Sequence, residues 1–203
     1  MNSYFLENTS SAIIAGGNSK RFGSTKLYIL FRQKRLIDYA IELAHQLTNH
    51  TCIIVGNAEI TNIPDIPQYK DIFSNCGPIG GIYTALVHSP TARVVILPCD
   101  MPFLSVAIYR ILSDNSIDTR PVIAVSPDGI EPVVSIWHQS SIPAFEVAIQ
   151  QKQYSLRPLM QELDANFVDL INGDSIYHPD WFRNINRMED ILTLENIPMI
   201  DEQ

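Results

Sequence analysis

The residues best suited to chemistry lie in one stretch near the start of the chain, at positions 11–26, which reads S-A-I-I-A-G-G-N-S-K-R-F-G-S-T-K. A short, uncharged apolar run leads directly into Gly16 and Gly17, and glycine lets a bulky ligand come close to backbone N–H groups. Three basic side chains follow at Lys20, Arg21 and Lys26. Amide donors and cations gathered at the end of a predicted strand favour a polyphosphate ligand.

Two common phosphate-binding motifs do not fit this stretch. The P-loop pattern has a glycine before its lysine, whereas Thr25 precedes Lys26 in this chain. The G-x-G-x-x-G pattern of dinucleotide-binding folds is also absent from the sequence. An ordinary surface loop with solvated charges is the alternative interpretation, and the residues of the loop alone leave it open.

Asp100 is the sharpest single candidate elsewhere in the chain. It follows the apolar run at 93–97 and lies between Pro98 and Pro102, which restrict the backbone on either side. Ligands of open α/β sheets bind at the carboxyl ends of strands, and a carboxylate beside a polyphosphate suggests a magnesium ligand. The alternative is that Asp100 caps a helix beginning near Ser105, although Ser105 is itself a suitable cap.

The C-terminal stretch W-F-R-N-I-N-R-M-E-D-I contains two amides, at Asn184 and Asn186. Asn186 with Glu189 three residues later is typical of a capping box that begins a helix over residues 188–194. Asn184 has no such structural explanation, so its amide is the stronger candidate for a ligand.

Apolar runs alternate with helical periodicity along the chain, which predicts an α/β fold. We expect an open, mostly parallel sheet with helices on both faces and an antiparallel portion in the C-terminal half. The predicted strands cover residues 12–15, 52–55, 93–97, 122–125, 132–137 and 167–170. The predicted helices cover residues 37–47, 106–112, 144–151, 156–163 and 188–194, and one more opens at 76–81 and carries Ile82, Leu86 and Val87. Residues 27–31 should lie against the sheet edge, and residues 63–67 should form a proline-rich connection ending near Asp71.

Length and composition limit the class of protein. With 203 residues we expect a single domain spanning 1–203, with an N-terminal half of about 1–105 and a C-terminal half of about 106–203. A net charge of −8 argues against a nucleic-acid-binding surface. The three cysteines lack metal-ligand spacing, and no signal peptide or run of about 20 apolar residues is present, so we expect a cytoplasmic protein with reduced thiols and no membrane partner.

The stretch A-G-G-N-S-K-R-F-G-S-T-K closely resembles the A-G-G-x-S-x-R-M-G-x-D-K signature of nucleotidyltransferases, and specifically that of the molybdenum cofactor guanylyltransferases. Three further stretches agree in order and spacing: G-P-I-G-G at 77–81, P-C-D-M-P at 98–102 and F-R-N-I-N at 182–186. The first motif is shared by many sugar and isoprenoid nucleotidyltransferases, whereas the combination is much more specific. Two positions depart from the family pattern, since Thr25 replaces the usual Asp and Phe22 the usual Met.

This resemblance implies a GTP site at the strand ends and a molybdopterin site in the C-terminal half. Carried over by position, the GTP-binding residues would be Ile14, Ala15, Gly16, Gly17, Lys26, Asn57, Asp71, Gly77 and Asp100. Arg21 and Lys26 would hold the phosphates, and Asp71 and Asn57 would contact the nucleoside. Asp100 would bind Mg²⁺, with Mn²⁺ as the alternative. Asn184 and Asn186 would lie near the metal or the pterin phosphate.

The implied reaction is attack by a terminal phosphate oxygen of molybdopterin on the α-phosphorus of GTP, with release of pyrophosphate. Positioning and charge neutralisation by Lys26, Arg21 and metal-bound Asp100 would carry it, because an anionic nucleophile needs no strong base. Other proteins of molybdenum cofactor biosynthesis and molybdoenzyme chaperones are further candidate partners.

Two other functions stay open. The first is a cytidylyltransferase acting on the same pterin or on another small molecule, although those relatives tend to have A-A-G where this chain has Ala15-Gly16-Gly17. The second is a non-catalytic homologue that only binds nucleotide or pterin. This alternative is considered because Thr25 replaces the Asp that is usual in the family.

Overall fold

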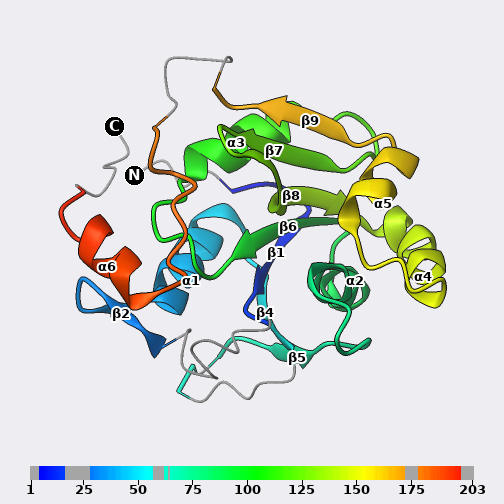
Figure 1. Ribbon diagram of the computed structural model, residues 1–203. Helices are drawn as coiled ribbons and strands as arrows, with labels where there is room; N and C mark the ends of the chain where they lie inside the picture. Colours follow the sequence, from blue (N-terminus) through cyan, green and yellow to red (C-terminus); the bar gives the residue numbers. More distant parts are fainter. Residues whose placement is uncertain (1–4, 17–27, 57–61, 64, 172–177, 198–203) are drawn as a thin grey trace.

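A seven-stranded sheet with helices on both faces organises the molecule (Figure 1). The computed structural model describes residues 5–16, 28–56, 62–63, 65–171 and 178–197. The strand order is β5-β4-β1-β6-β8-β7-β9. The strands of this sheet are β1 Thr9–Ile14, β4 Thr51–Gly56, β5 Gln68–Lys70, β6 Arg93–Pro98, β7 Val122–Ser126, β8 Gly129–His138 and β9 Asn166–Asp169. A separate two-stranded hairpin consists of β2 Leu30–Phe31 and β3 Lys34–Arg35.

Most strand pairs in the large sheet are parallel. Strand β1 pairs in parallel with β4 and β6, β4 with β5, and β7 with β9. Strand β8 runs antiparallel to both of its neighbours, β6 and β7. The predicted architecture, a mostly parallel sheet with an antiparallel portion in the C-terminal half, is therefore confirmed.

Helices cover the two faces of the sheet in separate groups. Helices α1 Leu36–Leu47 and α3 Val106–Asp114 share one hydrophobic cluster with the sheet. Helices α2 Pro78–His88, α4 Ile142–Gln150 and α5 Leu156–Glu162 share a second cluster on the opposite face. The short 3-10 helix η2 Gln139–Ser141 precedes α4, and α6 Met188–Leu194 lies near the C-terminus. No helix in the described ranges is both long enough and apolar enough to cross a membrane.

Each central strand is buried on both faces, which explains its continuous apolar sequence. Ile13 of β1 belongs to the cluster with α1 and α3, whereas its neighbours Ala12 and Ile14 belong to the cluster with α2. Strand β4 repeats this alternation, with Ile53 on the first face and Ile54 on the second. The sheet is thus the middle layer between two groups of helices, and the loops extend from the ends of its strands.

Two local predictions were wrong. Leu30 and Phe31 form a hairpin of their own with β3 and do not pair with the large sheet. The connection before Asp71 contains an extra edge strand, β5.

A third, smaller cluster joins three segments that are far apart in sequence, and we call it the hairpin–tail cluster. Its buried members are Phe31, Leu36, Phe103, Ile185, Ile191 and Leu194. They come from the β2–β3 hairpin with the start of α1, from the loop after β6, and from the C-terminal segment with α6. Figure 1 shows α6 beside β2 and α1, away from the middle of the large sheet.

The order of the strands creates a switch point between β1 and β6. The chain leaves β1 through α1 to β4 on one side, and later passes through α2 to β6 on the other side of β1. The strand order therefore reverses beside β1, where the loops that follow β1 and β6 both start at the carboxyl edge of the sheet. Open α/β sheets bind ligands at this position.

Candidate functional site

The carboxyl ends of β1 and β6 bring the two strongest sequence candidates to the same edge of the sheet. Ile14 pairs with Pro98 in the parallel register of these strands. Gly16 and Asp100 each follow two residues later, at the switch point. The glycine motif and the acid between two prolines are therefore neighbours in the fold, as the sequence predicted.

Gly16 lies so close to the end of β4 that no larger residue fits. A Cβ built on Gly16 would lie 2.8 Å from both the Cα and the N of Gly56. Gly56 itself has a φ of +60°, in the left-handed region that favours glycine. The N–H of Ala15 donates to the carbonyl of Ile54 at 2.9 Å, which fixes the two loops side by side. Backbone groups of both loops therefore form one compact surface.

Asp71 enters this surface from the end of β5. Its N–H donates to the carbonyl of Gly56 at 3.2 Å. Its carboxylate faces glycines from two elements, since a Cβ on Gly56 or Gly80 would lie 3.8 or 3.9 Å from Oδ2, and one on Gly81 would lie 3.9 Å from Oδ1. The sequence placed Asp71 at a nucleotide site, and the fold brings it beside Gly56 and close to Gly16.

The Asp71 carboxylate is not fully satisfied within the described chain. Its Oδ1 is buried and has no hydrogen-bond partner among those residues. Burial raises the pKa of Asp71 above the usual range of an aspartate, because the charged form loses solvation. A buried acceptor without a donor is costly, so this oxygen suits a ligand that supplies an N–H or O–H.

Gly77 and the start of α2 frame the same region. Gly77 is the N-cap of α2 with a φ of +66°, and Pro78 occupies the first turn. The N–H of Gly80 donates to the carbonyl of Gly77 at 3.1 Å. A Cβ on Gly80 would lie 2.8 Å from the carbonyl oxygen of Phe73, so this position also requires glycine. The G-P-I-G-G stretch thus packs closely around the Asp71 loop.

The capping alternative for Asp100 does not hold. Ser105 is the N-cap of α3, and its Oγ accepts from the N–H of Ala107 at 3.1 Å. Asp100 is partly buried, and its carbonyl accepts from the N–H of Ile185 at 2.9 Å. The side chain of Asp100 therefore does not cap α3.

That backbone contact brings the C-terminal asparagines to the switch point. Ile185 is fully buried in the hairpin–tail cluster, whereas its neighbours Asn184 and Asn186 are exposed. The two asparagines therefore flank Ile185, whose N–H donates to the carbonyl of Asp100. The capping box predicted for this segment used the wrong pair, because Arg187 is the N-cap of α6 and Asp190 is its partner. Asp190 Oδ2 accepts from the N–H groups of Asn186 and Arg187 at 2.6 and 2.7 Å.

Sequence reasoning missed Glu131, which β8 carries toward the same edge. Ser126 Oγ donates to Glu131 Oε1 at 2.8 Å. Burial raises the pKa of Glu131 most, the hydrogen bond from Ser126 opposes that, and the charges of Asp128 and Asp100 raise it further. Glu131 therefore lies within the electrostatic range of Asp100. Only the antiparallel pairing of β8 with β6 reveals this, and single-sequence patterns do not give strand partners.

The other residues predicted from the sequence include four outside the described ranges and one with a buried side chain. Gly17, Arg21, Lys26 and Asn57 lie outside the described residues. The side chain of Ile14 is 8% exposed and belongs to the α2-side core, so a contact of Ile14 with a nucleotide would be made by its backbone.

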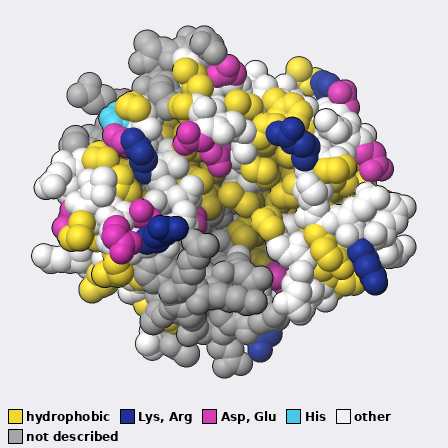
Figure 2. Space-filling view, in the orientation of Figure 1, with side chains coloured by type: hydrophobic (Ala, Val, Ile, Leu, Met, Phe, Trp, Pro, Cys, Tyr) yellow, Lys and Arg dark blue, Asp and Glu magenta, His cyan; other side chains and the backbone are white. Residues whose placement is uncertain are grey.

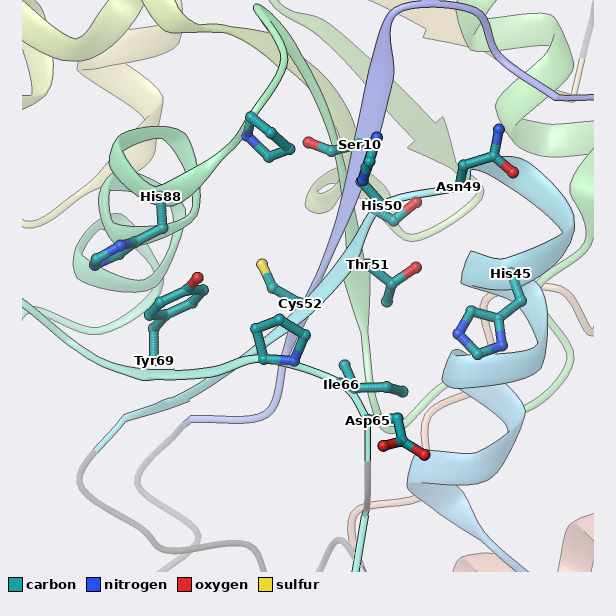
Figure 3. A pocket seen from close by; sticks show the side chains of 13 residues that line it. Ser10, His45, Asn49, His50, Thr51, Cys52, Asp65, Ile66, Tyr69 and His88 are labelled. Carbon is teal, nitrogen blue, oxygen red and sulfur yellow. The ribbon is translucent and has the colours of Figure 1, made fainter.

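A cavity of about 340 Å³ opens at the opposite, amino edge of β1 and β4 (Figure 3). Its lining includes Ser10, His50 and Thr51, and the ring of Tyr69 stacks on His88 with centroids 3.9 Å apart. None of the predicted site residues lines it. No group of three or more histidine, cysteine or acidic residues within the described ranges is arranged to hold a metal ion.

The visible surface agrees with the low basic content of the chain. On the face shown in Figure 2, the described Lys and Arg side chains are scattered, some beside acidic side chains and others among hydrophobic or uncharged ones, and hydrophobic side chains gather around the centre. The described part of this face shows no broad basic area.

The fold is an α/β fold with a strand-order switch point at the carboxyl edge of β1 and β6. The chain belongs to the family of MobA-like NTP transferase domains, whose model matches residues 11–166. It is therefore a nucleotidyltransferase.

Individual proteins agree with this family. The chain is 31% identical to the molybdenum cofactor guanylyltransferase of Vibrio vulnificus, over 90% of this chain and 93% of the relative. The crystal structure of molybdopterin-guanine dinucleotide biosynthesis protein A from Archaeoglobus fulgidus has the same fold, with a TM-score of 0.79 and 22% identity over 93% of this chain and 97% of that one. The 2-C-methyl-D-erythritol 4-phosphate cytidylyltransferase of Thermus thermophilus is similar at a TM-score of 0.66 and 11% identity, over 91% and 96% of the two chains.

Proposed function

We propose that this protein transfers GMP from GTP to the terminal phosphate of molybdopterin, which yields the guanine dinucleotide form of the molybdenum cofactor and pyrophosphate. The observation that carries the proposal is the 31% identity, over 90% of the chain, to a molybdenum cofactor guanylyltransferase. The adjacent placement of Gly16, Asp100 and Ile185 at the switch point supports it. We further propose that residues 1–203 act as one catalytic domain, with the nucleotide in the N-terminal half and the pterin in the C-terminal half.

The donors at the switch point suit a hard divalent cation. Asp100 offers a carboxylate, Glu131 places a second carboxylate within its electrostatic range, and the amide of Asn184 or Asn186 lies on the neighbouring segment. Oxygen ligands of this kind, together with phosphate oxygens, are those that Mg²⁺ prefers. We propose that Asp100 holds Mg²⁺, or Mn²⁺ in its place. When bound, the ion neutralises negative charge on the triphosphate and on the departing pyrophosphate.

In the reaction the chain's own residues bind and orient. The backbone around Gly16 and Gly17 would accept the nucleotide closely, and Arg21 and Lys26 would hold its phosphates. Asp71 would accept a hydrogen bond from the nucleoside through the oxygen that lacks a partner in the fold. Asn184 and Asn186 would orient the acceptor phosphate.

The chemical step forms one bond and breaks one. An oxygen of the acceptor phosphate bonds to the α-phosphorus of GTP, while the bond from that phosphorus to the bridging oxygen of the β-phosphate breaks. Pyrophosphate leaves with the electron pair of the broken bond. Because the nucleophile is already an anion, catalysis by orientation and charge neutralisation is sufficient and no protein base is needed.

Pyrophosphate release on mixing the protein with GTP, Mg²⁺ and molybdopterin tests the proposal. We expect stoichiometric pyrophosphate and a guanine dinucleotide product, and a much lower rate with CTP in place of GTP. A preference for CTP would support the cytidylyltransferase alternative and overturn the proposal. Binding of GTP without any release would support the non-catalytic homologue instead.

A further inference from the structure

The hairpin that follows the phosphate-binding stretch contains an unusual turn. Phe31 pairs with Lys34, so Arg32 and Gln33 form a two-residue connection. Both have positive φ values, 50° and 63°. Two-residue hairpin turns with this geometry strongly favour Asn-Gly, because β-carbon-bearing residues without a short polar side chain are strained there. The strain at Arg32 is therefore maintained by contacts outside the hairpin.

Those contacts are made by the Arg32 guanidinium to the end of α6. Its Nη2 faces the carbonyl oxygens of Leu194 and Glu195, each at 3.0 Å, and also that of Ile197. The last carbonyls of a helix have no intrahelical donors and carry partial negative charge, so a cation there is favourable. The guanidinium also lies over two rings of the hairpin–tail cluster, 4.9 Å from the centroid of Phe31 and 5.6 Å from that of Phe103.

Helix α6 connects the contacts of Arg32 to the candidate site. At its other end Asp190 Oδ2 accepts from the N–H groups of Asn186 and Arg187. The preceding residue, Ile185, is fully buried, and its N–H donates to the carbonyl of Asp100. One continuous set of contacts thus runs from Arg32 through α6 to Asp100.

We propose that Arg32 is a positioning residue that holds Asn184 and Asn186 beside Asp100, so that the acceptor phosphate is presented to the bound nucleotide. This inference rests on the proposed function. Arg32 touches neither substrate in the proposal, because its guanidinium is engaged by α6. It acts on the acceptor side of the site through the backbone of the C-terminal segment.

Steady-state kinetics of Arg32→Ala with GTP, Mg²⁺ and molybdopterin measure this role. We expect the KM for molybdopterin to rise about tenfold and the KM for GTP to change by less than about twofold. Arg32→Lys should recover part of the loss, since it keeps the charge without the planar fork. Lys34→Ala is the matched control, because Lys34 lies in the same hairpin but pairs with Glu42 and lies over Tyr39. Equal changes in both KM values, or none, would overturn the proposal.

A double variant separates positioning from stability. Arg32→Asn with Gln33→Gly gives the turn its preferred residues, so the hairpin itself should be no less stable. The contacts to α6 are nevertheless lost. We expect an unchanged or higher Tm together with the same rise in the KM for molybdopterin. A normal KM in this variant would show that Arg32 serves only the hairpin.

Amide exchange of Ile185 gives a readout that needs no activity. Its N–H is buried and bonded to Asp100 in the native chain, so it should exchange slowly. In the double variant we expect exchange of this amide to accelerate about tenfold, while amides of β1 stay protected. Unchanged exchange would reject the positioning role. If the wild-type protein made no guanine dinucleotide, the proposed function would fail, but this exchange experiment would still decide the role of Arg32.

Discussion

The two edges of the parallel strands carry polar residues in very different states. At the amino edge, hydroxyl groups form hydrogen bonds with one another. Ser10 Oγ lies 2.6 Å from Ser89 Oγ, and Thr48 Oγ1 donates to Ser11 Oγ at 2.8 Å. At the carboxyl edge Asp71 presents a buried oxygen that has no hydrogen-bond partner in the described chain. These amino-edge hydroxyl groups are satisfied within the fold, whereas the Asp71 oxygen is the acceptor for which we propose a ligand.

The two edges differ in the kind of polar group that the fold leaves without a hydrogen-bond partner. Thr51 Oγ1 at the amino edge is also buried without a partner, but an unpaired neutral hydroxyl costs less than an unpaired carboxylate. Glycine use differs as well, because Gly16, Gly56 and Gly80 at the carboxyl edge are fixed by close contacts or by positive φ. A cavity alone, such as the one in Figure 3, is therefore a weaker sign of function than unsatisfied charge beside tightly packed backbone.

The largest effect should come from Asp100→Asn. Removing the carboxylate that we assign to the metal should lower kcat by about 10²- to 10³-fold, a loss typical for a group that stabilises developing charge. The Tm should stay unchanged, because the contact to Ile185 is made by the backbone carbonyl of Asp100. Pyrophosphate release at saturating Mg²⁺ measures the effect.

Asp114→Asn is the control for this variant, since Asp114 is an exposed carboxylate at the end of α3. It should keep the full rate. A normal kcat for Asp100→Asn at saturating metal would remove Asp100 from the mechanism.

Gly16→Ala should have the next largest effect. The added methyl would meet the backbone of Gly56 at 2.8 Å, so the two loops must separate. We expect a loss of about 1–3 kcal/mol in unfolding free energy, typical of overpacking, together with a rise in the KM for GTP of at least about tenfold. Urea denaturation and steady-state kinetics measure the two quantities. Wild-type values for both would mean that the close contact has no part in nucleotide binding.

Asp71→Asn should weaken GTP binding by about five- to tenfold, because an amide oxygen is a poorer acceptor than a carboxylate. Isothermal titration calorimetry with GTP measures this. The free energy of unfolding should increase at neutral pH, since the variant buries no charge. A variant that binds GTP normally would show that the unpaired oxygen of Asp71 is not a nucleoside contact.

The stability effect of Asp71 should depend on pH with a defined sign. Burial raises its pKa in the folded state, so the folded protein holds this proton at higher pH than the unfolded chain does. The resulting penalty is present above the folded pKa and disappears below the unfolded value of about 3.9. Urea midpoints of wild type and Asp71→Asn should therefore differ at pH 8 and converge in acid. A difference that grows in acid would contradict this assignment.

The smallest effect should come from the amino edge. Replacing both His50 and His88 by Ala removes two imidazoles from the lining of the cavity. We expect kcat/KM for GTP to change by less than about twofold, because both substrates are proposed to bind at the carboxyl edge. A loss of kcat/KM comparable with that caused by Asp100→Asn would show that the amino edge also takes part in the reaction.

The sequence predicted the sheet, the crossovers and the partnership of Gly16 with Asp100, because each depends on local patterns and on one topological rule. It did not predict the β2–β3 hairpin, since Arg32 and Gln33 lack the glycine and asparagine that signal such a turn. The contacts that stabilise it come from α6, which lies more than 150 residues further along the chain.

Other misses have the same origin. Glu131 becomes a candidate site residue only when the pairing of β8 with β6 is known. The capping partner of α6 shifted from Glu189 to Asp190 because Arg187, not Asn186, occupies the N-cap. Local spacing locates a helix well, but which neighbouring acid reaches its first amides is decided by backbone geometry.

A crystal structure of the protein with GTP and Mn²⁺ tests the central claim most directly, because the anomalous signal of manganese marks the metal without ambiguity. We expect one ion about 2.2 Å from a carboxylate oxygen of Asp100, with the triphosphate between that ion and Gly16. Manganese and nucleotide bound in the cavity of Ser10, His50 and Tyr69 at the amino edge would contradict it.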